Sequence, residues 1–345
     1  MSASLARQAL FPLTLLYAAG VRFKNAAYDH RLLQPGRLAW PAISVGNLSV
    51  GGAGKTSMVL LLARLLAERG WAVDVLSRGY GRTGTQVLRV DPQGNAAQFG
   101  DEPLLMARHG LPVYVGAERY RAGVLAENET AHATGETPRL HLLDDGFQHR
   151  RLARSIDIVL LRRADLEDDM LPVGRLREPL SALQRADFCV LRAEDASMTE
   201  RVLQLMRTND PTRVWQIERK TVLPEKFIPR AFAFCALGEP QGFFLGLRKA
   251  GVDLQGTLAF RDHHVFRPKD VQRIEDAARK CGAERYVTTE KDGVRLDPAV
   301  LATLQARLPV TIAGLEVSLR DGSASMARLQ DMLAERLQLS HDGVR

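Results

Sequence analysis

The residues best suited to chemistry lie in a glycine-rich stretch that ends in Gly54, Lys55 and Thr56. An apolar run precedes it (residues 40–45), and an apolar helical pattern follows it (residues 58–66). Glycines let backbone N–H groups converge on phosphate oxygens, and a helix N-terminus adds partial positive charge there. Strand, glycine loop, Gly-Lys-Thr and helix form the context of a P-loop. We therefore expect nucleoside triphosphate binding by Gly51, Gly52, Ala53, Gly54, Lys55, Thr56 and Ser57.

One position departs from the strict P-loop pattern, because Ser49 stands where the first glycine is expected. The alternative is an ordinary glycine-rich turn that happens to precede Lys-Thr. The strand before the turn and the long apolar helix after it favour the P-loop. In that interpretation Lys55 reaches the β- and γ-phosphates, and the Thr56 hydroxyl lies on Mg²⁺.

Two adjacent carboxylates, Asp144 and Asp145, end a second apolar run that starts at Leu140. A buried strand that delivers aspartate beside a P-loop is the Walker B arrangement, which holds Mg²⁺. Paired aspartates can also be simple turn formers. With a P-loop upstream, the metal interpretation is favoured.

The elements that must position these residues alternate between strand and helix patterns. Strands are expected at 72–76, 112–116, 140–145, 156–161, 187–191 and 213–217, and residues 127–139 are expected to form a polar loop. This order predicts an α/β fold, a P-loop NTPase-like and mostly parallel sheet flanked by helices.

A second, smaller α/β unit is expected after a polar and charged stretch at about 195–228. Its strands are expected at 231–236, 257–260, 286–289 and 310–313, and its helices from Gln241 and over 268–280. Met326, Leu329, Leu333 and Leu337 have helical spacing and predict a closing helix. The predicted division is an N-terminal segment (1–37), a nucleotide-binding domain (38–220) and a smaller domain that closes over the active site (221–345).

Composition and net charge limit the classes of molecule that this chain is expected to bind. The chain has 345 residues, of which 46% are hydrophobic, and a net charge of +7. A basic balance suits an anionic partner such as a lipid headgroup or a phosphorylated substrate. No nucleic-acid-binding motif is present, so we expect no nucleic acid, and nothing indicates an obligate protein partner. Three isolated cysteines indicate reduced thiols in a cytosolic protein.

The N-terminal segment carries an apolar run (residues 10–21) flanked by Arg7, Arg22 and Lys24. The run is too short to span a hydrocarbon core. A signal peptide is disfavoured, because basic residues follow at once and a P-loop needs cytosolic nucleotide. Two interpretations stay open: a helix lying in the headgroup layer of a membrane, and a helix packed on the domain.

Several stretches together resemble the tetraacyldisaccharide 4′-kinase family. They are Val45–Thr56, Ser77–Gly81, Gly100–Pro103, Leu143–His149, Gly174–Leu180, Asp262–His263 and Thr288–Asp292. The Asp-Asp-Gly-Phe-Gln-His and Leu-Arg-Glu-Pro-Leu stretches are far more specific than a P-loop. The family's loop also lacks the first glycine, as at Ser49. One stretch is looser, since Ala236–Pro240 reads Ala-Leu-Gly-Glu-Pro where the family tends to read Gly-Ile-Gly-Asn-Pro.

The resemblance implies an ATP- and Mg²⁺-dependent kinase of lipid A biosynthesis in a Gram-negative bacterium. Its substrate would be an acylated disaccharide 1-phosphate lipid, which it would phosphorylate at the 4′-hydroxyl to give lipid IVA. It would work at the cytoplasmic face of the inner membrane, as a peripheral protein anchored to the membrane surface by its N-terminal helix.

The resemblance also assigns roles within the site. Asp101 would accept the proton of the attacking hydroxyl, paired with His263 from the second domain. Arg177 would offset charge on the transferring group beside Lys55, and the Mg²⁺ ligands would come from Thr56, Asp144, Asp145 and Glu178. Apart from the resemblance, Arg78, Arg82 and Arg119 are candidates for the substrate's phosphate, and a plain solvated arginine is the alternative for each. From the residues alone, a helix cap is the commonest reason for an aspartate at position 101, and a surface loop histidine is the alternative for His263.

Two other function classes share some of these features. A membrane-associated ATPase or GTPase switch would also use a P-loop, but the sequence lacks the Asn/Thr-Lys-x-Asp stretch that reads guanine. A soluble small-molecule kinase or ligase would have no use for the apolar N-terminal segment.

Overall fold

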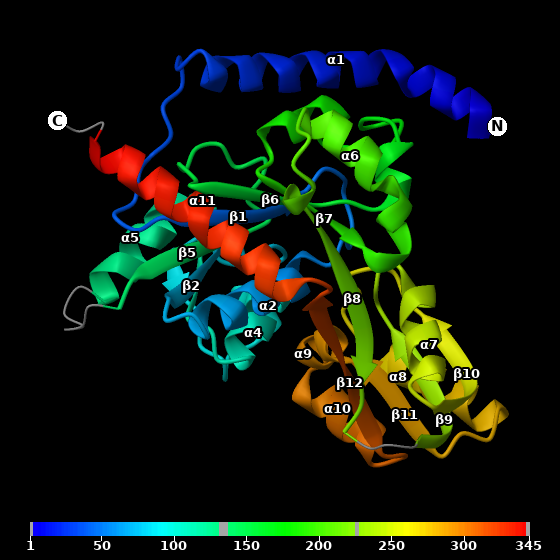
Figure 1. The fold of residues 1–345 in the computed structure, drawn as a ribbon. Coiled ribbons are helices and arrows are strands. Elements are labelled where there is room, and N and C mark those ends of the chain that lie inside the picture. Colours follow the sequence, from blue (N-terminus) through cyan, green and yellow to red (C-terminus); the bar gives the residue numbers. More distant parts are fainter. Residues whose placement is uncertain (1–2, 131–136, 225–227, 343–345) are drawn as a thin grey trace.

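The computed structural model describes residues 3–130, 137–224 and 228–342. In these ranges the strands form one twelve-stranded sheet in the order β10-β9-β11-β12-β8-β7-β6-β1-β5-β2-β4-β3. The sheet runs through two lobes that lie end to end (Figure 1). The α/β class with a mostly parallel sheet is therefore confirmed.

The first lobe has the phosphate-binding strand near the middle of its sheet. Its strands are β1 (Ala42–Asn47), β2 (Ala72–Ser77), β3 (Leu88–Arg89), β4 (Val113–Val115), β5 (Arg139–Asp144), β6 (Ile156–Leu160), β7 (Phe188–Arg192) and β8 (Val214–Val222). Strand β1 lies between β5 and β6 and is parallel to both. All six of its residues are buried, because helices cover both faces of a parallel sheet.

Helices connect and cover these strands. They are α1 (Ala3–Asp29), α2 (Lys55–Ala67), α3 (Ala96–Phe99), α4 (Asp101–Arg108), α5 (Arg119–Thr130) and α6 (Thr199–Met206), with short 3₁₀ turns η1 (Arg163–Leu166), η2 (Leu180–Arg185), η3 (Ala193–Met198) and η4 (Pro211–Arg213). Helix α5 continues through Thr130, so the prediction that residues 127–139 form a loop is wrong for 127–130. In the last turn of α5, the Thr130 hydroxyl donates a hydrogen bond to the Ala126 carbonyl at 2.7 Å. Residues 131–136 of that predicted loop lie outside the described ranges.

The second lobe is a smaller α/β unit. Its elements are β9 (Ile228–Cys235), α7 (Pro240–Lys249), β10 (Val252–Ala259), α8 (Pro268–Lys280), β11 (Arg285–Thr289), α9 (Glu290–Arg295), α10 (Pro298–Gln305) and β12 (Val310–Leu319). Strands β10, β9, β11 and β12 are parallel neighbours. Their faces are covered by two separate apolar clusters, one of them built around Phe232 and Phe234.

The two lobes share a strand ladder. Strand β8 pairs with β7 in parallel, and its far half pairs with β12 in antiparallel register, Val222 opposite Gly314. Helix α11 (Gly322–Asp342) then returns to the first lobe, where Met326, Leu329 and Leu333 join the core beneath α2. The division at 220/221 stays a prediction. By packing, α11 belongs with the nucleotide-binding lobe, whereas β8 pairs with strands of both lobes.

Helix α1 lies along the outer edge of the first lobe (Figure 1). It packs on that lobe through polar contacts: the Tyr17 hydroxyl donates to the Arg177 carbonyl at 3.0 Å, and Arg150 pairs with Asp29 at 2.7 Å. Its other face is apolar and exposed, with Leu16 at 70% and Phe23 at 77%. No helix in the described ranges is long and apolar enough to cross a membrane.

Candidate active site

The phosphate loop, residues 48–54, joins the carboxyl end of β1 to the start of α2. Gly51 and Gly54 have positive φ values of 107° and 89°, which side chains other than glycine rarely adopt. Helix α2 begins at Lys55, so its unpaired N–H groups face the loop. The Lys55 ammonium donates to Asn47 Oδ1 at 3.1 Å and lies 3.4 Å from Asp145. The predicted P-loop residues therefore meet at one helix N-terminus, which suits an anionic ligand.

Asp145 and Arg177 form a bidentate pair beside the loop. The two guanidinium nitrogens of Arg177 donate to the two carboxylate oxygens at 2.9 and 2.8 Å, and Arg177 also donates to Asn47. Burial alone would raise the pKa of Asp145, but Arg177 and Lys55 hold it well below its usual range. Asp145 is thus an ionised carboxylate that bridges two cations.

Asp144 has a different environment although it is the next residue. Its side chain is buried and accepts a hydrogen bond from the Ser77 hydroxyl at 3.0 Å, while Oδ1 has no hydrogen-bond partner among the described residues. Burial and the nearby charges of Glu102 and Asp145 raise its pKa to about 7. A buried oxygen without a partner beside a second carboxylate is what a divalent cation would complete.

Asp101 and His263 come together across the two lobes. Asp101 begins α4 in the first lobe, and its Oδ2 lies 3.0 Å from Nδ1 of His263 in the second. Arg295 from α9 donates to the same oxygen at 2.7 Å. Burial alone would raise the pKa of Asp101, but His263, Arg295 and Lys291 lower it well below its usual range. The helix cap is Gly100 rather than Asp101, so the capping interpretation does not account for this carboxylate.

Further contacts hold the same junction. Glu102 accepts from Lys291 at 2.6 Å, and the Tyr80 ring meets the His263 ring edge-on with centroids 5.6 Å apart. Helix α4 therefore docks on α9 by two charged pairs. The position of His263 depends on how the lobes meet.

Glu178, expected among the Mg²⁺ ligands, is engaged elsewhere. Its buried carboxylate pairs with Arg185 at 2.9 Å and accepts from Asn25 of α1 at 3.0 Å. A metal role for Glu178 stays a prediction. What the structure adds is a link from α1 to the residue after Arg177.

The three arginines expected to bind a substrate phosphate differ. Arg119 is buried at the start of α5, and its Nε has no hydrogen-bond partner in the described part of the chain. Arg82 donates to the Gln86 carbonyl, and Arg78 is exposed. Burial and the charge of Arg78 lower the pKa of Arg119, opposed by Asp145. Arg82 and Arg119 thus each keep a buried nitrogen without a hydrogen-bond partner in the described part of the chain, and of the two Arg119 is the residue that is buried as a whole.

Comparisons with known proteins match nearly the whole chain. A model of the tetraacyldisaccharide-1-P 4′-kinase family (LpxK) matches residues 6–335. The tetraacyldisaccharide 4′-kinase of Koribacter versatilis is 42% identical over 335 residues, which cover 94% of this chain and 99% of that protein. The chain belongs to the tetraacyldisaccharide 4′-kinase family.

Other members agree. The tetraacyldisaccharide 4′-kinase of Geobacter metallireducens is 38% identical over 326 residues, covering 90% of this chain and 93% of that protein. A crystal structure of the "apo" form of LpxK from Aquifex aeolicus in complex with ATP has a TM-score of 0.73 at 31% identity, covering 96% of this chain and 99% of that one. The family resemblance and the expected enzyme class, a phosphotransferase, are confirmed.

Sequence reasoning missed several groups in this kinase family member. Asn47 accepts hydrogen bonds from Lys55 and Arg177. It follows the apolar residues of β1, and a polar side chain at the carboxyl end of a strand is a signal that the sequence offered. Ser77 has the same placement on β2. Lys291 lies in the family-like stretch Thr288–Asp292 but was given no role there, and Arg295 had no signal, because only the docking of α9 against α4 brings both to the site.

Proposed function

We propose that this chain transfers the γ-phosphoryl group of ATP to the 4′-hydroxyl of a tetraacyldisaccharide 1-phosphate, a step of lipid A biosynthesis. The observation that carries the proposal is the Asp101–His263 pair, 3.0 Å apart, which joins the second lobe to the lobe that holds the phosphate loop. A P-loop protein that only hydrolyses nucleotide needs no carboxylate–imidazole pair on a second lobe. A kinase needs a proton acceptor for its alcohol substrate.

The phosphate loop and its cations hold the transferring group. Lys55 and the amides at the start of α2 bind the β- and γ-phosphates, and Arg177 offsets charge that develops during transfer. Arg177 is now held by Asp145 and Asn47, which fixes its guanidinium at the mouth of the loop. Phosphoryl transfer requires positioning and charge neutralisation above all, and this arrangement supplies both.

The residues around Asp144 fit Mg²⁺. Thr56, Asp144 and Asp145 would hold the ion directly or through water, with Glu178 as a more remote candidate. The unpartnered Oδ1 of Asp144 supports this set, since oxygen ligands are what Mg²⁺ prefers. When bound, the ion would neutralise charge on the β- and γ-phosphates.

Asp101 and His263 act together on the proton of the hydroxyl. The depressed pKa of Asp101 keeps its carboxylate ionised at every working pH, so it both orients the imidazole and accepts hydrogen bonds. His263 is exposed enough on its other side to face a substrate, at 36%. Because the pair exists only when the lobes meet, ATP is protected from wasteful hydrolysis while they are apart.

A cavity of about 330 Å³ suits the head of a phosphorylated lipid. It lies between the end of α1 and the β5–β6 turn, and Tyr28, Tyr120, His149 and Arg151 are among its lining residues. Burial and the charges of Arg119, Arg154 and Arg151 lower the pKa of His149 to about 3. Arg151 lines the cavity together with Glu118, and Arg119 and Arg154 lie near His149, so positive charge is available there for a phosphate group.

The membrane surface is the proposed working place. The exposed face of α1 carries Leu13, Leu16 and Phe23, and the exposed Arg22 precedes Phe23 in the chain. A helix that is tied down by polar contacts yet leaves such side chains in solvent is suited to the headgroup layer. We assign that surface to the cytoplasmic face of the inner membrane, where ATP is available.

The first test is transfer of labelled γ-phosphate from ATP to detergent-dispersed tetraacyldisaccharide 1-phosphate. Native protein should label the lipid, and Asp101→Asn should lose about 10²–10⁴-fold in kcat while still binding ATP. Lys55→Met should lose about 10²–10³-fold. Glu284→Gln, an exposed carboxylate in the second lobe, is the control. Native protein that hydrolyses ATP but never labels the lipid would remove the proposal.

Membrane attachment is tested by flotation with vesicles that contain anionic phospholipid. Leu16→Glu and Phe23→Glu should abolish flotation of the protein with the vesicles. Leu245→Glu, the same kind of substitution at an exposed leucine of α7, should float with native protein. If all three variants float alike, α1 is not the attachment surface.

A further inference from the structure

Three neighbouring strands place three side chains in a row behind the phosphate loop. In the sheet, Asn47 of β1 pairs with Leu160 of β6, and Leu160 pairs with Val190 of β7. Two residues further on, at the carboxyl ends of these strands, stand Ser49, Arg162 and Arg192. The register therefore brings one residue of the phosphate loop and two arginines to the same level, on the side of the loop away from Asp101.

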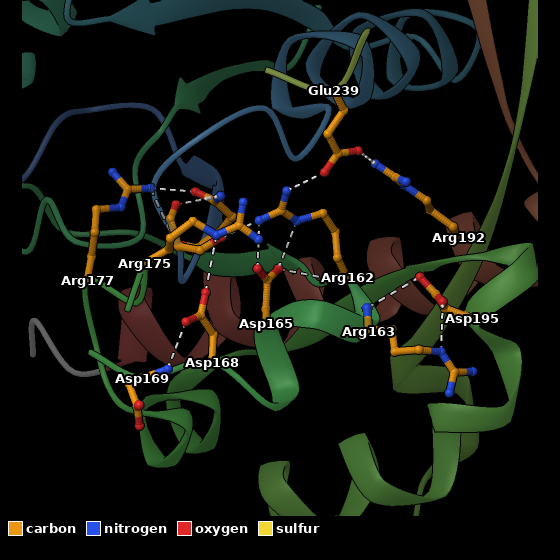
Figure 2. Close-up of polar contacts among 12 residues, drawn as sticks. Arg162, Arg163, Asp165, Asp168, Asp169, Arg175, Arg177, Arg192, Asp195 and Glu239 are labelled. Carbon is orange, nitrogen blue, oxygen red and sulfur yellow. Dashed lines mark hydrogen bonds and ion pairs between the residues drawn. The ribbon is translucent and has the colours of Figure 1, made fainter. Parts of the chain in front are cut away.

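One carboxylate from the second lobe reaches both arginines (Figure 2). Glu239, just before α7, accepts from Arg162 at 2.5 Å through one oxygen and from Arg192 at 2.8 Å through the other. The preceding residue, Gly238, lies against the loop as well: a Cβ there would stand 3.8 Å from the Gly52 nitrogen. Gly238 thus lies close to the phosphate loop, and Glu239 lies on the two arginines behind it.

Arg162 continues the contact to the loop itself. Its guanidinium is buried, at 6% exposure, and donates to the Ser49 hydroxyl at 3.0 Å and to Asp165 at 2.7 Å. Asp165 also accepts from the Arg162 backbone N–H at 3.0 Å, so the arginine is fixed from both ends. The guanidinium presents its N–H donors in a rigid planar fork, so Arg162 holds these partners in one fixed geometry.

We propose that Glu239 is a closure latch and that Arg162 is a positioning residue, which together couple the seating of the second lobe to the shape of the phosphate loop. The inference rests on the proposed function. When the second lobe seats, Glu239 completes the arginine pair, and Arg162 is held where it fixes Ser49. The phosphate loop is then ordered for the triphosphate at the same moment as His263 arrives at Asp101 on the opposite side.

The latch makes ATP affinity depend on a residue outside the first lobe. Glu239→Gln keeps the shape of the side chain and removes its charge. It should raise KM for ATP about tenfold with a smaller effect on kcat, because a lower population of the seated state weakens apparent binding. Ser49→Ala should act in the same direction. A merely structural role would lower the melting temperature and the active fraction without changing KM.

Glu239 and Ser49 are not in contact, so a double-mutant cycle tests the connection through Arg162. Glu239→Gln with Ser49→Ala should weaken ATP binding no more than Glu239→Gln alone, whereas Glu239→Gln with the control Glu284→Gln should be additive. Additive effects of Glu239→Gln and Ser49→Ala, or a KM for Glu239→Gln equal to that of Glu284→Gln, would overturn the proposal. If Glu239→Gln does not fold, Arg192→Gln removes the other half of the same contact.

Binding of a non-hydrolysable ATP analogue with Mg²⁺ separates this inference from the proposed function, because it needs no lipid. Hydrogen exchange over residues 46–57 with the analogue bound should be faster in Glu239→Gln than in native protein. If native protein fails to label the lipid but Glu239→Gln still exchanges faster over residues 46–57, the proposed function is contradicted and the latch is supported. If lipid is labelled and exchange is unchanged by Glu239→Gln, the latch falls.

Discussion

Asp101 and His263 are 162 residues apart in the chain, and Asp101 Oδ2 lies 3.0 Å from His263 Nδ1. The same oxygen accepts a hydrogen bond from Arg295, so the Asp101 carboxylate contacts two side chains of the second lobe, those of His263 and Arg295. The contact is therefore both a part of the site and a part of the surface on which the lobes meet.

The charge of Arg295 sets the pH at which Asp101 protonates. Arg295 helps hold that pKa below its usual range, so Arg295→Gln should raise it and move the acid limb of the kcat/KM profile to higher pH. Activity at a fixed mildly acidic pH should fall more than activity at pH 8. Arg307→Gln, an exposed arginine of the same lobe, is the control, and a limb at the same pH in both variants would contradict the assignment.

The substitution Asp144→Asn is expected to have opposite effects on the stability of the metal-free protein and on metal binding. Its pKa of about 7 in the folded protein is above the unfolded value, so its burial destabilises the metal-free protein increasingly as pH rises toward 7. Asp144→Asn should raise the melting temperature of metal-free protein at pH 8 while reducing Mg²⁺-dependent activity. In native protein, Mg²⁺ affinity should fall below pH 7. Calorimetry with and without Mg²⁺ checks both, with Asp91→Asn at the surface as the matched control.

Arg119 is expected to act on the lipid substrate. Arg119→Gln removes the unused buried donor and should raise KM for the tetraacyldisaccharide 1-phosphate about tenfold, with KM for ATP unchanged. Arg121→Gln, an exposed arginine two residues on, provides the comparison. An equal rise in both Michaelis constants would place Arg119 in nucleotide binding instead.

A buried histidine at the opposite end of the strands makes stability depend on pH. His141 lies 2.6 Å from Asp74 and 3.4 Å from Glu127, and its ring stacks on Trp40, over which Arg139 lies. Burial alone would lower its pKa, but the two carboxylates raise it to about 9.

A histidine pKa raised on folding contributes stability that is complete below the unfolded value near 6.5 and is lost as pH rises through 9. The loss is at most ~3.4 kcal/mol, for a shift from 6.5 to about 9 at about 1.36 kcal/mol per pKa unit. The melting temperature should therefore fall between pH 7 and 10 in native protein and in an exposed His30→Asn control, and fall less in His141→Leu. A flat profile for native protein would contradict the charged pair.

The order of strands and helices was readable from the sequence because the central strands of the parallel sheet, such as β1 and β6, are buried on both faces and mainly apolar. Helix α8 has the bounds predicted from its pattern, 268–280. The extension of β8 and β12 was not readable. Their outer halves, around Lys220 and Glu316, pair with each other in solvent and carry the charged residues that indicated a linker.

The site was predictable where a residue follows an apolar strand. Lys55, Asp144 and Asp145 were found in that way. Asp101 and His263 needed the family resemblance, because a helix start and a loop histidine look ordinary in a single sequence. The contact between Arg162 and Glu239 could not be predicted from the sequence, because it depends on strand register and on how the second lobe packs against the first.

Helix α11 completes the apolar core under α2, yet it follows the whole second lobe in the chain. The second lobe is thus an insertion between β8 and α11. A ribosome makes α11 roughly ten seconds after β8, at about 5–20 residues per second. Until then the nucleotide-binding core is open on one side, and the nascent chain has a phosphate loop on an unfinished support. Competence to bind ATP therefore arises late in synthesis, when the inserted lobe that carries His263 is already present.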